Sequence, residues 1–174
     1  PLKFRSAWVP VANLGGGISM VVILLAFWWR LGMLRRALRA TAANVGKPSE
    51  DSYADTLRAL AMVPTPQIRS VLDLGCGTGG QTMVLANNAS GQITGVDLFP
   101  TFIDMFNANR QKLNLQEKVV GVVGSMENLH FQDEELDLIW SEGTIMYIGF
   151  ERGLTEWREM LVPNGYLVVH DAST

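Results

Sequence analysis

The chain has 174 residues, enough for one ordinary domain, and its apolar share of 48% and charged share of 18% are typical of globular proteins. All seventeen acidic residues but only seven of the fourteen basic residues lie from Glu50 onward, a balance of −10 that argues against a nucleic-acid partner. The single cysteine, Cys76, excludes an internal disulfide and a multi-cysteine zinc site, and no metal-ligand spacing is visible, so no metal is predicted.

The first 45 residues differ from the rest in being apolar and basic. Residues 6–29 carry no charge, but they reach the roughly 20 apolar residues of a membrane-spanning helix only if Pro10 and three glycines are included. The four arginines that follow at 30–39 would place the rest of the chain in the cytoplasm. We expect residues 1–45 to be either a membrane anchor or a non-native extension, with any membrane contact made through residues 6–40.

Residues 46–174 alternate between helical and strand-like patterns after a turn-rich linker at 46–50. The apolar periodicity predicts helices over residues 53–62 and 80–87, from 100 onward and from about 150 to 163, and strands over residues 70–74, 92–97, 118–124, 136–140 and 166–170. Strands that alternate with helices predict an α/β fold, a doubly wound sheet of five parallel strands with both faces covered.

Two of the predicted helices carry apolar residues at helical spacing. The helix that Pro100 opens is expected to turn Ile103, Phe106 and Leu113 toward the sheet. The helix before the last strand is expected to end at residues 163–165 and to bury Phe150, Leu154, Trp157 and Leu161. Because the chain starts at Pro1 and stops at Thr174 just after a strand-like run, we expect it to be a fragment.

A glycine-rich turn follows the first predicted strand and opens a helix. Such a turn brings the backbone close to a ligand and points the amides of a helix N-terminus at an anionic group. Gly75, Gly77 and Gly80 also have the spacing of a dinucleotide site, so the glycines alone allow either NAD or S-adenosylmethionine (SAM). Asp73 favours SAM, because a carboxylate there lies poorly beside a pyrophosphate but can bind an ammonium.

Residues 71–79, Val-Leu-Asp-Leu-Gly-Cys-Gly-Thr-Gly, resemble the first motif of the class I SAM-dependent methyltransferases. The resemblance extends over about residues 51–174 and is strongest to the small-molecule methyltransferase type. It implies SAM as the cofactor and a Rossmann-like sheet in the order 3-2-1-4-5. It also implies that the last two strands of the family's sheet are missing, so that residues 46–174 form a truncated SAM-binding domain whose fifth strand is an exposed edge.

The resemblance implies a set of cofactor contacts at the ends of the first two strands. The first motif contributes Asp73, Gly75, Cys76, Gly77 and Gly79. Asp97 ends the second strand, where an acid accepts hydrogen bonds from the ribose hydroxyls, although an aspartate before Pro100 is also a good helix N-cap. Leu98, which follows it directly, is expected to pack beside the adenosine.

Further contacts are expected after the third and fourth strands. Ser125 stands where the family often has an acid that binds adenine, and Met126 is expected to lie against the adenine face. After the fourth strand, Ser141 is expected near the cofactor. Glu142 is the first candidate for a catalytic base or substrate ligand, with a cofactor-side or structural role as the alternative, and Tyr147 is a weaker candidate for lining the substrate site.

The function expected from the resemblance is methyl transfer from SAM to a small-molecule acceptor in the cytoplasm. One alternative is an NAD-dependent oxidoreductase, which the glycine spacing allows and Asp73 disfavours. Another is a membrane-tethered protein that binds SAM without catalysis. The acceptor and the oligomeric state do not follow from the sequence.

Overall fold

The computed structural model describes residues 50–64 and 67–170 of the chain. The predicted segment 1–45, its membrane contact through residues 6–40 and the linker residues 46–49 therefore lie outside the described residues. Within those two described ranges, no helix is both long enough and apolar enough to cross a membrane.

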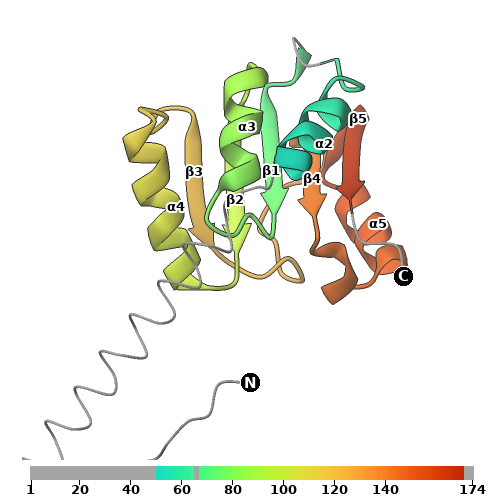
Figure 1. The fold of residues 1–174 in the computed structure, drawn as a ribbon. Coiled ribbons are helices and arrows are strands. Elements are labelled where there is room, and N and C mark those ends of the chain that lie inside the picture. The colour runs from blue at the N-terminus through green and yellow to red at the C-terminus, as the bar shows by residue number, and fades with distance from the viewer. Residues whose placement is uncertain (1–49, 65–66, 171–174) are drawn as a thin grey trace, which may run out of the picture. The chain divides into compact units, whose positions relative to one another are not determined.

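Helices and strands alternate along the chain, as the apolar periodicity predicts (Figure 1). The elements are α2 (Glu50–Leu60), β1 (Ser70–Leu74), α3 (Gly80–Asn88), β2 (Gln92–Asp97), α4 (Pro100–Lys112), β3 (Val119–Val123), β4 (Leu136–Glu142), the 3-10 turn η2 (Ile145–Tyr147), α5 (Phe150–Arg158) and β5 (Leu161–His170).

The five strands form one parallel sheet in the order β3-β2-β1-β4-β5, which confirms the predicted order (Figure 1). The chain leaves β1 for β2 on one side and later returns to place β4 on the other. Loops after neighbouring strands therefore diverge at the carboxyl ends of β1 and β4, and this divergence opens a crevice in doubly wound folds. Residues 75–79, which join β1 to α3 and are called the glycine loop below, lie at this point.

Helices cover both faces of the sheet. Side chains of α2, α3 and α4, among them Leu60, Leu85 and Phe106, pack with Val71 of β1 in one core. Trp157 of α5 packs with alternate strand residues, including Leu72, in the second. Because successive side chains of a strand point to opposite faces, this division puts Val71 and Asp73 on the face that α2, α3 and α4 cover.

Phe106 sets how closely α4 approaches the sheet. Its side chain is fully buried, and a Cβ atom added to Gly79, Gly95 or Gly121 would lie 2.7 Å from its ring. These glycines lie in the loop after β1, in β2 and in β3, so one ring fills space that three separate segments leave free. This contact fixes α4 beside the glycine loop, where the candidate site is built.

The C-terminal part departs from the prediction. Helix α5 ends at Arg158, and Leu161 begins β5 instead of ending the helix. The turn residues Pro-Asn-Gly at 163–165 form a bulge inside β5. Leu136 pairs with Leu161 and Leu138 pairs with Tyr166, so β5 has three more residues than β4 between these two pairs. A turn sequence therefore does not distinguish the end of a helix from a bulge.

Three predicted core positions were also wrong. Leu113 is 52% exposed because α4 stops at Lys112, one residue earlier. Phe150 and Leu154 are 57% and 37% exposed, since the shorter α5 turns mainly Trp157 and Gly153 inward.

Candidate functional site

A pocket of about 500 Å³ lies at the carboxyl ends of the strands. It is formed by the loops that follow β1, β2, β3 and β4, the arrangement that the sheet order predicts. Its lining residues are Gly75, Gly77, Val96, Asp97, Leu98, Phe99, Phe102, Gly124, Ser125, Met126, Glu127, Gly143, Thr144 and Tyr147.

The glycine loop forms one wall of this pocket. Gly75, Gly77 and Gly79 have φ angles of 73°, 54° and 88°, a region that side chains disfavour. The N–H groups of Gly75 and Cys76 both donate to Val96 O, at 2.8 and 3.1 Å, which ties the loop to the end of β2. A Cβ atom on Gly77 would meet no protein atom within 4 Å, so the loop is open on that side.

Asp97 joins the glycine loop to the loop before α4. Its Oδ2 accepts a hydrogen bond from Gly77 N–H and its Oδ1 accepts one from Phe99 N–H, both at 2.9 Å. Helix α4 has Phe99 as its N-cap residue and no side-chain cap, so Asp97 is not that cap. Each carboxylate oxygen has a further lone pair, which leaves this buried side chain able to accept hydrogen bonds from a ligand in the pocket.

Asp73 lies behind the loop and does not line the pocket. Its side chain is 2% exposed, and its Oδ2 accepts a hydrogen bond of 2.5 Å from the Thr82 hydroxyl of α3. Burial raises the pKa of Asp73 to about 7; the Thr82 bond lowers it, and the charges of Glu142 and Asp97 raise it further. The predicted ammonium contact of Asp73 stays a prediction.

Glu142 is held from two sides. Its Oε1 accepts hydrogen bonds from the Thr56 hydroxyl of α2 at 2.8 Å and from the Trp140 indole N–H at 2.9 Å. The side chain is half-buried and does not line the pocket. These contacts favour a cofactor-side or structural role for Glu142. Its role as a catalytic base stays a prediction.

Thr144 locks the loop after β4 against the loop after β1. Its hydroxyl donates to Leu74 O at 2.8 Å and lies 2.9 Å from the Ser141 hydroxyl, while a Cβ atom on Gly75 would lie 2.3 Å from its Cγ2. Ser141 itself is fully buried and lies off the pocket, so its contact reaches the pocket through Thr144.

We expect Thr144→Val to lower the free energy of unfolding by about 1–2 kcal/mol, because valine keeps the shape but removes the donor to a buried carbonyl. Chemical denaturation measures the change. The matched control is Thr155→Val, whose exposed hydroxyl donates only to Glu151 O within α5 and whose loss should change stability by less than about 0.5 kcal/mol. Equal losses of stability in the two variants would show that the hydrogen bond from Thr144 to Leu74 O stabilises the fold no more than the exposed bond of Thr155 does.

The loop after β3 is held by α5. Trp157 donates its indole N–H to Met126 O at 3.4 Å, and Arg152 forms an ion pair of 2.9 Å with Glu127. Ser125 and Met126 both line the pocket, where adenine contacts are expected. The Ser125 hydroxyl accepts a hydrogen bond from Glu127 N–H at 3.2 Å, which leaves its own proton available to a ligand.

Apolar side chains also line the pocket. Leu98 and Phe99 are 61% and 58% exposed, and the Phe99 ring meets the edge of Phe102 at 5.4 Å between ring centres. Tyr147 of η2, which is 78% exposed, lies on the β4 side of the same pocket. Exposed aromatic and aliphatic groups around a polar loop are typical of small-molecule sites.

Of the ten predicted cofactor contacts, six line the pocket: Gly75, Gly77, Asp97, Leu98, Ser125 and Met126. Asp73, Cys76, Gly79 and Ser141 lie just outside it. Cys76 is turned into the core, where burial, and then the charges of Asp73 and Asp97, raise the pKa of its thiol far above the usual range. The thiol is therefore unsuited to nucleophilic attack.

Several lining residues were not predicted from the sequence. Phe102 had a signal in the sequence, since it follows Phe99 by one helical turn. Glu127 and Thr144 follow the predicted third and fourth strands, but their contacts with Arg152 and Gly75, which are distant in the chain, had no signal in the sequence.

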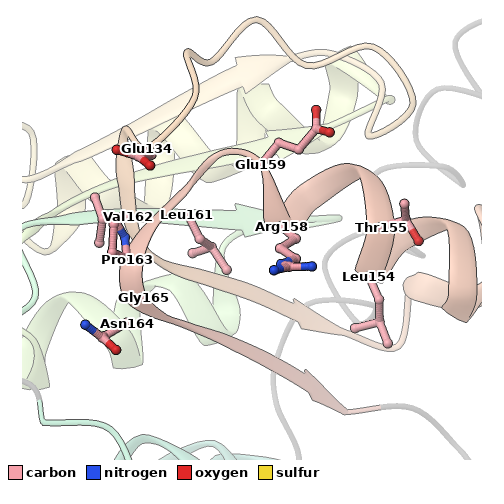
Figure 2. Close-up of a pocket in the computed structure, with 10 residues that line it drawn as sticks. All are labelled: Glu134, Leu154, Thr155, Arg158, Glu159, Leu161, Val162, Pro163, Asn164 and Gly165. Carbon is pink, nitrogen blue, oxygen red and sulfur yellow. The ribbon is translucent and has the colours of Figure 1, made fainter.

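A second cavity of about 810 Å³ is larger but shares no lining residue with the pocket at the glycine loop. Figure 2 shows that its side chains come from the end of α5 and the first residues of β5, together with Glu134. It lies where β5 begins, whereas the glycine loop follows the end of β1. Among the described residues no ion pair joins Arg158 to a carboxylate, and no cluster of three or more His, Cys, Asp or Glu could hold a metal ion.

Comparison with known proteins identifies one matching family model, described as a methyltransferase domain, over residues 72–169. An uncharacterized protein of Haemophilus influenzae is 31% identical over 108 residues, which cover 60% of this chain and 43% of that protein. A probable tocopherol O-methyltransferase of Oryza sativa is 38% identical over 73 residues, 42% of this chain and 20% of the relative.

Among solved structures, the geranyl diphosphate C-methyltransferase of Streptomyces coelicolor has a TM-score of 0.63 at 21% identity. The match covers 68% of this chain and 43% of that one. At this identity the likeness shows the fold alone. The chain spans less than half the length of these relatives.

Proposed function

The chain belongs to the methyltransferase domain family, and on that premise we propose that it binds SAM and transfers its methyl group to a small organic acceptor. The observation that carries the proposal is the placement of Asp97, whose carboxylate holds two loops at the rim of the pocket. The volume of about 500 Å³ is within the range of roughly 300–1,000 Å³ that small-molecule sites have.

The residues around the pocket fit the groups of SAM. Asp97 is proposed to accept hydrogen bonds from the ribose hydroxyls, and Met126 and Leu98 offer apolar surface to adenine. The open side of Gly77 admits a ligand close to the backbone. Asp73 is the proposed partner of the ammonium, a group that the nicotinamide dinucleotides lack.

SAM when bound supplies a methyl group on a sulfonium, and the transfer is an in-line displacement. The protein contributes mainly by holding donor and acceptor in line. We place the acceptor on the β4 side of the pocket, where Gly143, Thr144 and Tyr147 line it. A base is needed only for an acceptor that must lose a proton. Location in the cytoplasm and membrane contact through residues 6–40 are likewise proposals.

Separate calorimetric titrations with SAM and with NADH test the cofactor assignment. We expect SAM and its demethylated product, S-adenosylhomocysteine, to bind and NADH not to bind. Binding of NADH alone would overturn the proposal in favour of an oxidoreductase.

Formation of S-adenosylhomocysteine from SAM in the presence of small organic acceptors then tests catalysis. Binding of SAM with no turnover for any acceptor would favour a protein that binds SAM without catalysis.

A further inference from the structure

Two carboxylates lie close together behind the glycine loop. Asp73 of β1 is in register with Trp140 of β4, and Glu142 follows Trp140 on the same face of the sheet. The Trp140 indole N–H donates to Glu142, and the charge of Glu142 raises the pKa of Asp73. The two acids therefore interact electrostatically across the β1–β4 pair.

Within the described part of the chain, only neutral groups hydrogen-bond these two acids. Thr82 donates to Asp73, and Thr56 and Trp140 donate to Glu142. The ion pairs among residues 50–64 and 67–170 are Arg58–Asp55, Arg152–Glu127 and Arg152–Glu156, so none compensates either acid.

Among the described residues, the neighbouring elements place no cation in an ion pair with either acid. The titratable base His170 of β5 is exposed and in register with Glu142, but no ion pair joins the two. Helix α3 carries no charged residue, and β2 contributes Asp97, a third acid. On α2, Arg58 is paired with Asp55 and its side chain is 76% exposed. Burying a carboxylate without a cation is costly, and a proton removes much of that cost.

We propose that Glu142 is a positioning residue for cofactor binding that acts through Asp73: beside the Glu142 charge, Asp73 holds a proton in the free protein and releases it to solvent when an α-ammonium binds. The inference rests on the proposed function, because it takes SAM as the source of the ammonium. The raised pKa of Asp73, about 7, agrees with it. The ammonium then provides a positive charge for an acid that no ion pair among the described residues compensates.

The sign of the pH dependence follows directly. Below pH 7 Asp73 is mostly protonated, so binding of an ammonium must displace the proton and the observed affinity falls as the pH falls. We expect the dissociation constant to rise toward 10-fold per pH unit as the pH falls below about 7, with more proton released on binding at pH 6 than at pH 8.

Calorimetry of S-adenosylhomocysteine binding to the 174-residue protein, in two buffers with different ionisation enthalpies, counts these protons without any turnover. 5′-Methylthioadenosine, which has the same nucleoside but no ammonium, should bind without releasing a proton. Wild-type protein that binds S-adenosylhomocysteine at pH 6 with release of less than about 0.1 proton would overturn the inference.

Variants separate the roles of the two acids. Asp73→Asn keeps an oxygen for Thr82 and should bind without proton release. Glu142→Gln keeps an oxygen for Thr56 and Trp140 but removes the charge, so proton release at pH 7 should fall below half of the wild-type value. Glu151→Gln, an exposed acid on α5, serves as the control and should match the wild type.

An unchanged pH profile in Glu142→Gln would show that Glu142 acts only as a structural residue and would overturn its role through Asp73. If Asp73→Asn does not fold, the Glu142→Gln profile and the 5′-methylthioadenosine comparison still decide the matter. Failure of the wild type to bind S-adenosylhomocysteine at any pH would instead overturn the proposed function, and the inference with it.

Discussion

Replacing Asp97 with asparagine is expected to weaken the binding of S-adenosylhomocysteine at least about 100-fold, equivalent to roughly 2.7 kcal/mol. The carboxylate accepts from both Gly77 N–H and Phe99 N–H at 2.9 Å. An asparagine side chain has one oxygen, so one backbone N–H would face an NH2 group instead of an acceptor. The ribose hydroxyls would also lose a charged acceptor, and hydrogen bonds to charged groups contribute about 1.5–3 kcal/mol each.

Isothermal calorimetry measures this loss, and circular dichroism shows whether the variant has folded. Asp104→Asn is the matched control, because it makes the same change on an exposed position of α4 outside the pocket. Its affinity should equal that of the wild type. An Asp97→Asn protein that folds and binds within threefold of the wild type would mean that Asp97 does not hold the ligand or its loops.

Replacing Phe106 with alanine is expected to lower the free energy of unfolding by about 3–5 kcal/mol. The side chain is fully buried, and its ring fills the space above Gly79, Gly95 and Gly121. Glycines have no side chain that could move into the cavity left by the ring, so this cavity cannot close easily. The loss should place the variant near the limit of folding, since domains are stable by only about 5–15 kcal/mol.

Urea denaturation measures the change, with Phe150→Ala as the control. Phe150 is 57% exposed at the start of α5, so its removal should cost less than about 1 kcal/mol. Similar losses in the two variants would show that the Phe106 contact with the three glycines is not a major source of stability. Phe106→Leu, which fills more of the space, should lose less than Phe106→Ala.

The sheet and the position of the site could be predicted because their signals are local. Alternating strand and helix patterns indicated a parallel sheet, and carboxyl ends of parallel strands share one edge. Asp97 and Gly77 lie twenty residues apart, yet each could be placed at that edge from its own strand. Their bond of 2.9 Å agrees with this placement.

The sequence wrongly predicted that the last helix extends to residues 163–165, and this has a physical cause. Residues 163–165 carry a turn signature, and such a signature is compatible with both a helix end and a strand bulge. Pairing with β4 decided between them, because Leu136 pairs with Leu161 and Leu138 pairs with Tyr166, which leaves residues 163–165 as a bulge within β5. That choice depends on hydrogen bonds between strands and not on the local sequence.

By itself the sequence determined the α/β class, the glycine loop after β1 and the acid at the end of β2, since each depends on residues within one short segment. Only the tertiary structure decided that Asp73 is buried against Thr82, that Glu142 is held by Thr56 and Trp140, and that Thr144 lies on Gly75. These contacts join segments far apart in the chain, and burial and electrostatic interaction arise only when folding brings such segments together.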